Sequence, residues 1–189
     1  MLRYRMAVLI PALLLSACAS TPPSRHYLLS PLAMQTSTSA EAEHRLGVGL
    51  ISLPDYLNRS QLVVRGHGGR LLMRDGERWG EALEDSVRRV LGENLGRLLG
   101  VGRVVFLPAP AGLTVTNRLQ MEITAFDAGT DQELQLSARW SLSQTSGTPR
   151  LHESHIKVAL RGDDASATVA AMNEALLQLA NEIAAATSR

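Results

Sequence analysis

The residue types that carry enzyme chemistry are present in this sequence but do not combine into a catalytic set. There is no Gly-x-Ser-x-Gly nucleophile motif, no Gly-x-x-x-x-Gly-Lys phosphate loop and no His-Glu-x-x-His zinc motif. Gly66-His67-Gly68-Gly69 has the residues of an oxyanion loop, but without a nucleophile motif to serve it is more typical of a hairpin turn. The sequence therefore predicts a protein that is not an enzyme.

Two further groups of ionisable residues favour structural roles. His152 and His155 are three residues apart in a segment with the alternation of a strand. Their imidazoles are then expected on opposite faces, where they would not share a metal ion. Asp163-Asp164 precedes a helical pattern, where an acidic residue more often caps the helix than acts as an acid or base. We predict neither a metal site nor a bound cofactor.

Cys18 is the single cysteine, and its position is more informative than its reactivity. It follows Arg3 and Arg5, an apolar run over residues 6–15 and two small residues, which is the order of a secretory signal. The run is shorter than the roughly 20 residues that a membrane span needs. Because there is no second cysteine, a disulfide within the chain is excluded.

Residues 15–18 (Leu-Ser-Ala-Cys) resemble the lipobox of bacterial lipoproteins. The resemblance implies that residues 1–17 are a signal peptide and that Cys18 then carries lipid on its sulfur and its amine. Acyl chains hold a protein on a membrane, at about 0.8 kcal/mol for each buried methylene. Lipoproteins of this kind that stay in the inner membrane tend to have Asp directly after the lipidated cysteine. The residue here is Ala19, and the absence of Asp favours the outer membrane. The alternative is an ordinary secretory signal followed by a free cysteine.

Charge and composition exclude several classes of partner. The 19 basic and 18 acidic side chains nearly balance, and two of the basic ones, Arg3 and Arg5, lie in the predicted signal peptide. The mature chain therefore lacks the basic surface that nucleic-acid binding requires, and it lacks a polybasic patch for anionic lipid. Its length suits one folded domain.

The mature chain divides into a tether and one domain. Residues 18–44 are predicted to be a lipidated tether and flexible segment, because residues 20–24 include two prolines and residues 35–44 are polar. Between them, residues 27–31 form a short apolar patch that we expect to dock on the domain as an edge strand. Residues 45–189 are predicted to form a single α+β domain.

Alternation of apolar and polar residues predicts strands, and apolar spacings of three and four predict two helices. The expected strands cover residues 46–51, 61–65, 70–73, 104–107, 119–125, 134–142 and 156–160, and the expected helices cover residues 79–99 and 164–186. The fully apolar run at 104–107 predicts a buried strand, and the last three strands are expected to form an antiparallel meander. The predicted fold class is α+β, with a mainly antiparallel sheet and two amphipathic helices packed on one face.

Two blocks of sequence carry a resemblance to a known family. The first is Leu53-Pro54-Asp55-Tyr56-Leu57, followed by the pattern Arg-x-Gln-x-Val-x-Arg over residues 59–65, and the second is the helical block over residues 79–95. Together with the lipobox, these blocks resemble the PqiC family of ABC-transport auxiliary lipoproteins over nearly the whole mature chain. The resemblance implies a periplasmic, non-enzymatic subunit that is anchored to the outer membrane by lipid.

The resemblance also implies partners. A PqiC-like protein is expected to dock on the far end of a PqiB-like MCE-domain tunnel, which moves lipid between membranes and supports envelope integrity. Assembly of copies into a homo-oligomeric ring and contact with phospholipid are compatible with this role. The alternative hypothesis is a periplasmic lipid-binding module that carries a lipid in its own pocket. A periplasmic hydrolase is the hypothesis with the least support.

Six residues are candidates for a partner or self interface. They are Gly47, Gly49, Tyr56, Arg59, Arg65 and Trp79. The two glycines leave one face of the first domain strand bare, so that another chain could approach closely. The arginines belong to a hairpin that could contact phosphate head groups or an acidic partner, although neighbouring acids also fit a solvated surface of mixed charge. Trp79 is either a staple onto the core or an exposed interface anchor.

Overall fold

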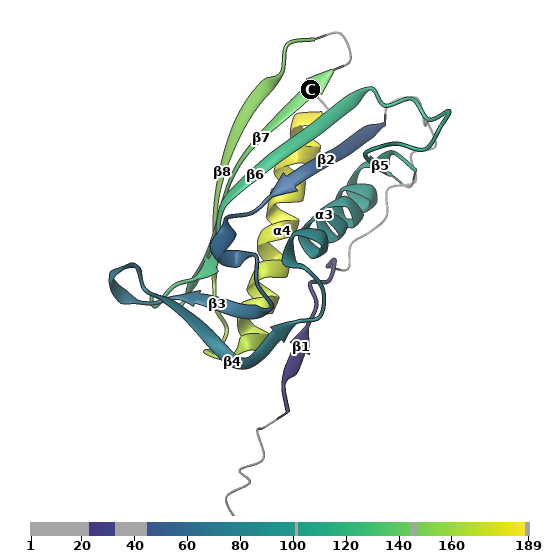
Figure 1. Cartoon of the computed structure of the whole chain (residues 1–189). Helices are drawn as coiled ribbons and strands as arrows, with labels where there is room; N and C mark the ends of the chain where they lie inside the picture. The colour runs from purple at the N-terminus through teal and green to yellow at the C-terminus, as the bar shows by residue number, and fades with distance from the viewer. Residues whose placement is uncertain (1–22, 33–44, 101, 145–146, 188–189) are drawn as a thin grey trace, which may run out of the picture.

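One curled sheet with two helices makes up the part of the chain that the computed structural model describes, residues 23–32, 45–100, 102–144 and 147–187 (Figure 1). The strands are β1 Arg25–Tyr27, β2 Leu46–Ser52, β3 Gln61–Arg65, β4 Leu71–Trp79, β5 Val104–Phe106, β6 Asn117–Ala128, β7 Glu133–Gln144 and β8 Arg150–Ala159. The helices are α3 Leu83–Leu99 and α4 Ala165–Thr187, with short 3-10 turns η1 Asp55–Leu57 and η2 His67–Gly69. The predicted α+β class is confirmed.

The sheet is mixed, so the prediction of a mainly antiparallel sheet was wrong. The pairs β1/β4, β2/β5, β2/β6 and β3/β6 are parallel, whereas β3/β4, β6/β7 and β7/β8 are antiparallel. Alternation reveals that a segment is a strand but not which strand it pairs with. The long connection through β3, β4 and α3 returns the chain to β2 in the parallel sense, as a crossover connection does.

The meander β6–β8 forms as predicted and supplies most of the sheet's apolar face. Its inward side chains are Leu119, Met121, Ile123, Phe126, Leu134, Leu136, Ala138, Trp140, Leu142, Ile156 and Val158, all of them buried. A register shift between Ile123 and Ala125 changes which residues of β6 face inward. After this bulge Phe126 and Ala128 point to the core, and Asp127 lies on the outer face.

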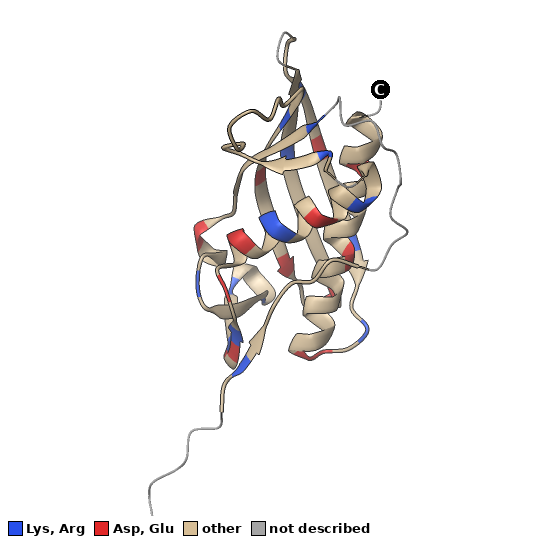
Figure 2. Ribbon diagram, turned by 90° about the vertical axis from the view of Figure 1, so that its right-hand side faces the viewer, with Lys and Arg blue, Asp and Glu red and all other residues tan. Residues whose placement is uncertain are grey.

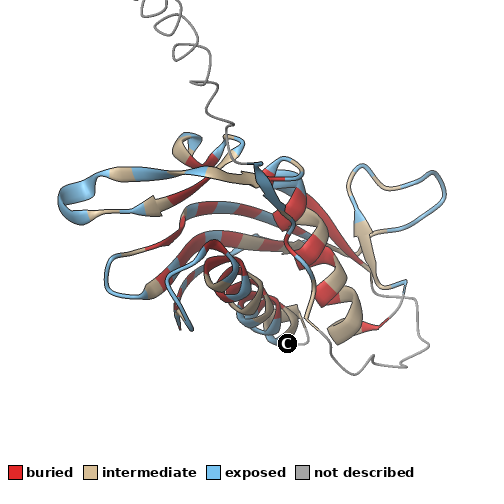
Figure 3. Cartoon of the chain, turned by 90° about the horizontal axis from the view of Figure 1, so that it is seen from below, coloured by how far each residue is buried: buried red, intermediate tan, exposed pale blue. Residues whose placement is uncertain are grey.

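Both helices lie on the inner, concave side of the sheet (Figure 3). Asp164 caps α4 by accepting a hydrogen bond from the Ala167 backbone N–H at 2.7 Å, as expected of one of the two aspartates. Fully buried Ala175 and Ala180 let α4 approach α3 and the sheet closely. Within the described residues, neither helix has the length and hydrophobicity that a membrane span needs.

Two elements differ from their predictions. Trp79 ends β4, which continues through Gly76 at φ 82°, and α3 begins only at Leu83. The apolar run at 104–107 gives the three-residue edge strand β5 with partial exposure, not a buried strand. Its aromatic side chain packs on Gly92 of α3, where an added Cβ would lie 2.4 Å from the Phe106 ring.

Candidate interaction surface

Tyr56 and Arg65, two of the sequence-predicted candidates, meet at Asp127. The Arg65 guanidinium forms a bidentate ion pair with this carboxylate, with Nε 2.7 Å from Oδ2 and Nη2 3.0 Å from Oδ1. The Tyr56 hydroxyl donates to the same Oδ1, and Arg65 Nη2 lies 3.2 Å from that hydroxyl. The cluster therefore joins η1 and the end of β3 to the end of β6.

The environment of this cluster shifts two pKa values. Burial, followed by the hydrogen bond and negative charge of Asp127, raises the pKa of Tyr56 to about 12. The hydrogen bond to Asp127 also raises the pKa of Arg65. The Asp127 side chain is only 3% exposed while that of Arg65 is 43% exposed. This pattern indicates a clamp that fixes the fold locally, with one cation still open to solvent.

The fold itself fills the space beside Gly47 and Gly49. A Cβ at Gly47 would lie 2.8 Å from Val115 Cγ1 and 3.0 Å from Leu107 Cδ2, and a Cβ at Gly49 would lie 3.0 Å from the Leu119 carbonyl oxygen. The close approach expected at these glycines is thus made by the chain itself, by the segment between β5 and β6 at Gly47 and by the β6 backbone at Gly49. No partner is needed to explain them.

Trp79 and Arg59 are also used within the fold. Trp79 is 7% exposed and belongs to the core, which is the first of its two predicted interpretations. Arg59 is half-buried, and its Nη1 donates to Met73 Sδ at 3.4 Å. Arg59 therefore lies beside β4 and not in the Tyr56 cluster.

The two histidines of β8 lie apart, as the strand spacing predicted. His152 stacks on Trp140 with ring centroids 4.1 Å apart, whereas His155 Nδ1 lies 3.3 Å from the Ser137 hydroxyl. Among the described residues, no group of three or more His, Cys, Asp or Glu side chains is arranged to hold a metal ion.

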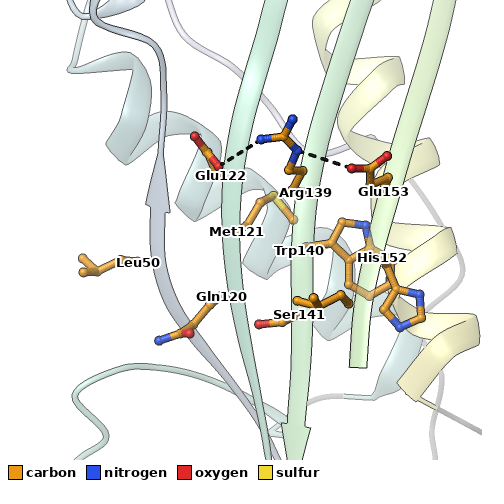
Figure 4. Close-up of a pocket in the computed structure, with 10 residues that line it drawn as sticks. Leu50, Gln120, Met121, Glu122, Arg139, Trp140, Ser141, His152 and Glu153 are labelled. Carbon is orange, nitrogen blue, oxygen red and sulfur yellow. Dashed lines mark ion pairs between the residues drawn. The ribbon is translucent and has the colours of Figure 1, made fainter. Parts of the chain in front are cut away.

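The outer face of the sheet carries a groove of about 380 Å³ that was not predicted (Figure 4). Strand register places Gln120, Ser141 and Leu151 in one row across β6, β7 and β8, and Leu50 lies beside them on β2. Leu50 and Leu151 are 82% and 84% exposed, the most exposed of the large hydrophobic side chains that the structure describes. Neither helix covers this face (Figure 3).

An exposed chain of ion pairs forms the next row of the groove. Arg139 Nη1 lies 4.0 Å from Glu122 Oε2, and Arg139 Nε lies 3.3 Å from Glu153 Oε1. All three side chains are more than half exposed, and such pairs contribute about 0–1 kcal/mol to stability. The groove therefore joins two apolar side chains to an acidic row, on a surface that the fold does not need for its core.

A sequence signal for this groove existed. Leu151 is five residues before Ile156, so on one strand the two must point to opposite faces. Leu50 and Ile51 are consecutive apolar residues in a strand, and one of them must also face outward. Leu50 and Leu151 are apolar residues at positions where the alternation of each strand expects an outward-facing polar residue, and the sequence prediction did not use this signal.

The N-terminal segment is fastened to the domain as a strap over residues 25–32. β1 pairs with β4 at the sheet edge, and Leu29 is inserted into the core at 1% exposure. Arg89 Nη2 and Arg97 Nη1 of α3 donate to the carbonyl oxygens of Leu29 and Leu32, at 3.0 and 2.7 Å. The strap thus fixes where the chain arriving from its N-terminus enters the domain.

Comparisons with known proteins agree on one family. Residues 27–184 match the family model described as ABC-type transport auxiliary lipoprotein component. The chain is 27% identical over 138 residues to the intermembrane transport lipoprotein PqiC of Escherichia coli K12, covering 72% of each chain, and equally similar to that of Shigella flexneri.

Solved structures share the fold. One crystal structure of an uncharacterized protein matches with a TM-score of 0.72 at 21% identity, covering 86% of this chain and 97% of the other. A protein from Xanthomonas campestris matches with a TM-score of 0.65 at 16% identity, covering 84% and 92%. The family expected from the sequence is confirmed: the chain belongs to the PqiC family of ABC-type transport auxiliary lipoproteins.

Proposed function

We propose that this protein is a non-enzymatic docking subunit of an intermembrane lipid-transport system. It is held at the periplasmic face of the outer membrane by lipid on Cys18, and it receives the end of a PqiB-like MCE-domain protein. Family membership and the transport role named for the PqiC relatives support this assignment. The observation that carries the docking role is the exposed Leu50–Leu151 row on a sheet face that the helices leave open.

The groove has the composition of a small interaction surface. Two leucines at its margins can insert into a partner, and desolvated apolar anchors of this kind supply most of the energy of protein interfaces. Arg139 lies between two carboxylates, so the row Glu122–Arg139–Glu153 has a net negative charge. A partner with exposed apolar side chains flanked by basic residues is complementary to it.

The alternative function, a module that carries a lipid in its own pocket, has less support. Leu134 and Leu136 of β7 and Leu176 and Leu179 of α4 are all 0% exposed. Helix α4 therefore packs directly on the sheet, where a lipid-carrying fold would need space for an acyl chain. Phospholipid that stays with the purified protein in a fixed molar ratio, detected by mass spectrometry, would favour the alternative.

The docking role is tested by recovery of the partner from solubilised envelope membranes. The full chain with Cys18 intact should recover an MCE-domain protein. Leu50→Ser combined with Leu151→Ser should reduce that recovery by about tenfold or more, as loss of interface anchors does. Leu28→Ser combined with Leu113→Ser is the matched control, because these side chains are also exposed and do not line the groove. Absence of any MCE-domain protein from the wild-type sample would refute the docking role.

The anchor is tested separately. Cys18→Ala should move the protein from the outer-membrane fraction to the periplasm while the domain stays folded. Retention of that variant on the membrane would show that the lipobox assignment is wrong. A homo-oligomeric ring, the other expectation from the resemblance, is tested by the mass of the detergent-purified protein.

A further inference from the structure

The β3–β4 hairpin projects beyond the layer of β6–β8 and exposes its tip (Figure 3). The tip turns through η2, where Gly68 and Gly69 have φ values of 66° and 77°. Behind it Leu72 and Met73 are 43% and 45% exposed, although they are consecutive residues of a strand and so point to opposite faces. Both faces of the projecting hairpin therefore carry apolar side chains that the domain does not cover.

The chain as a whole is near neutral, but this hairpin has a local excess of basic side chains. From β3 to the end of β4 it contains Arg65, Arg70, Arg74 and Arg78 against the acids Asp75 and Glu77. Arg70 at the tip is exposed and has no ion-pair partner among the described residues. Figure 2 shows basic and acidic positions close together at the end of the molecule where β1 lies. Exposed apolar side chains beside unpaired arginine are suited to an anionic lipid surface.

The length of chain before β1 brings a membrane within reach of this hairpin. Arg25 is the seventh residue after Cys18, so the anchor lies within about 25 Å of Arg25. Arg25 pairs with Glu77 in a parallel register, which directs the preceding chain toward the start of β4. Leu71 is six residues before Glu77, or about 20 Å along the strand. In Figure 1 the hairpin projects to the left of the molecule, and β1 begins at its lower end.

We propose that the β3–β4 hairpin rests on the membrane that holds the lipid anchor, with Leu72 and Met73 at the acyl boundary and Arg70 at phosphate head groups. This inference rests on the anchoring part of the proposed function. The strap limits how far the domain can turn about its tether, because β1 and Leu29 are part of the fold. Hairpin contact then fixes one orientation of the domain, in which the Leu50–Leu151 groove faces away from the bilayer.

Register supports this separation of the two surfaces. Val64 of the hairpin pairs with Ala128 at the end of β6, whereas the groove lies at Gln120. Ala128 is the eighth residue after Gln120 along β6, or about 26 Å away. A partner that arrives from the opposite membrane would thus meet the groove before the bilayer.

The test is amide hydrogen exchange of the full lipidated chain in vesicles of phosphatidylethanolamine and phosphatidylglycerol, compared with the same chain in detergent. Exchange over residues 66–73 should slow by about tenfold in vesicles, and peptides of β7 and β8 should not change. Combining Arg70→Ser, Leu72→Ser and Met73→Ser should abolish the slowing. The matched variant Leu50→Ser with Leu151→Ser should retain it. High salt should weaken the effect because it screens the arginine charge.

The outcomes separate this inference from the anchor. If the wild type floats with vesicles but exchange over residues 66–73 is unchanged, the hairpin contact is wrong and the anchor stands. If the wild type does not float, anchor and hairpin contact both fail. Protection that is already complete in detergent, at a mass of more than one chain, would assign the hairpin to a second copy and overturn the membrane contact.

Discussion

The meander half of the molecule, β6–β8 with α4, and the end formed by β1, β3 and β4 are held together by different forces. In the meander, long strands pair with their sequence neighbours and bury one continuous apolar face against α4. At the end formed by β1, β3 and β4, strands are short or kinked, and arginines fix the chain through carbonyl and carboxylate oxygens. Burial stabilises the first region, whereas directional polar contacts position the second.

The largest effect is expected from the meander core. Phe126→Ala removes the largest of the fully buried side chains that the structure describes, and truncation of a buried phenylalanine costs about 3–5 kcal/mol. The free energy of unfolding, measured by urea denaturation of the full chain, should fall by that amount. A loss under 1 kcal/mol would show that the meander does not carry most of the stability and would remove the contrast between the two regions.

The same contrast explains what the sequence could predict of the fold. In the meander, each strand or helix buries one face against neighbours that are close in sequence, so its local pattern is informative. The alternation at Leu134–Leu142 and the spacing of Val169, Met172 and Leu176 therefore predicted β7 and α4 close to their observed bounds. At the other end, pairing depends on residues far apart in the chain. For example, Arg25 of β1 pairs with Glu77 of β4, and no local sequence pattern predicts this pairing.

The candidate surfaces follow the same division. Tyr56 and Arg65 were selected from the sequence, but their partner Asp127 is 62 residues beyond Arg65 and reaches the outer face only through the bulge in β6. Gly47 and Gly49 signalled a close approach, yet the sequence could not show that Leu107 and Val115 would make it. Leu50 and Leu151 became a surface only when four strands aligned them.

The second effect tests the strap. Leu29→Ala should reduce the free energy of unfolding by about 2 kcal/mol, the low end for a buried leucine, because a segment near the chain end can close over the gap. Leu28→Ala is the control, since Leu28 is 53% exposed and should change stability by less than about 0.5 kcal/mol. Equal effects of the two variants would show that the strap is not packed into the core.

The third effect tests the polar clamp. Asp127→Asn removes the charge that pairs with Arg65, and we expect a loss of about 1–2 kcal/mol. This is less than the 3–5 kcal/mol for breaking a buried pair, because Arg65 is 43% exposed and water can solvate it. Glu153→Gln, in an exposed ion pair of the groove, should cost about 0–0.5 kcal/mol. If Glu153→Gln lowered the free energy of unfolding more than Asp127→Asn does, the groove ion pair would stabilise the fold and the Asp127 clamp would not.

The smallest effect is a pH dependence in the clamp, measured on Tyr56→Phe. Because the folded state raises the pKa of Tyr56 from 10.0 to about 12, folded protein retains a proton that the unfolded chain releases between these values. The stabilisation from protonated Tyr56 is therefore complete below pH 10 and is lost as pH rises from 10 to 12. Near neutral pH, Tyr56→Phe should cost about 1 kcal/mol, the value of one hydrogen bond.

Comparison of the two proteins across that window isolates the tyrosine. Lys157, whose pKa is raised by its hydrogen bond to Glu133, also loses a stabilising proton at high pH, but it does so equally in wild type and variant. The difference in unfolding free energy between wild type and Tyr56→Phe should thus shrink as pH rises from 10 to 12. A constant difference would mean that Tyr56 ionises alike in the folded and unfolded states, and that its hydroxyl does not belong to the clamp.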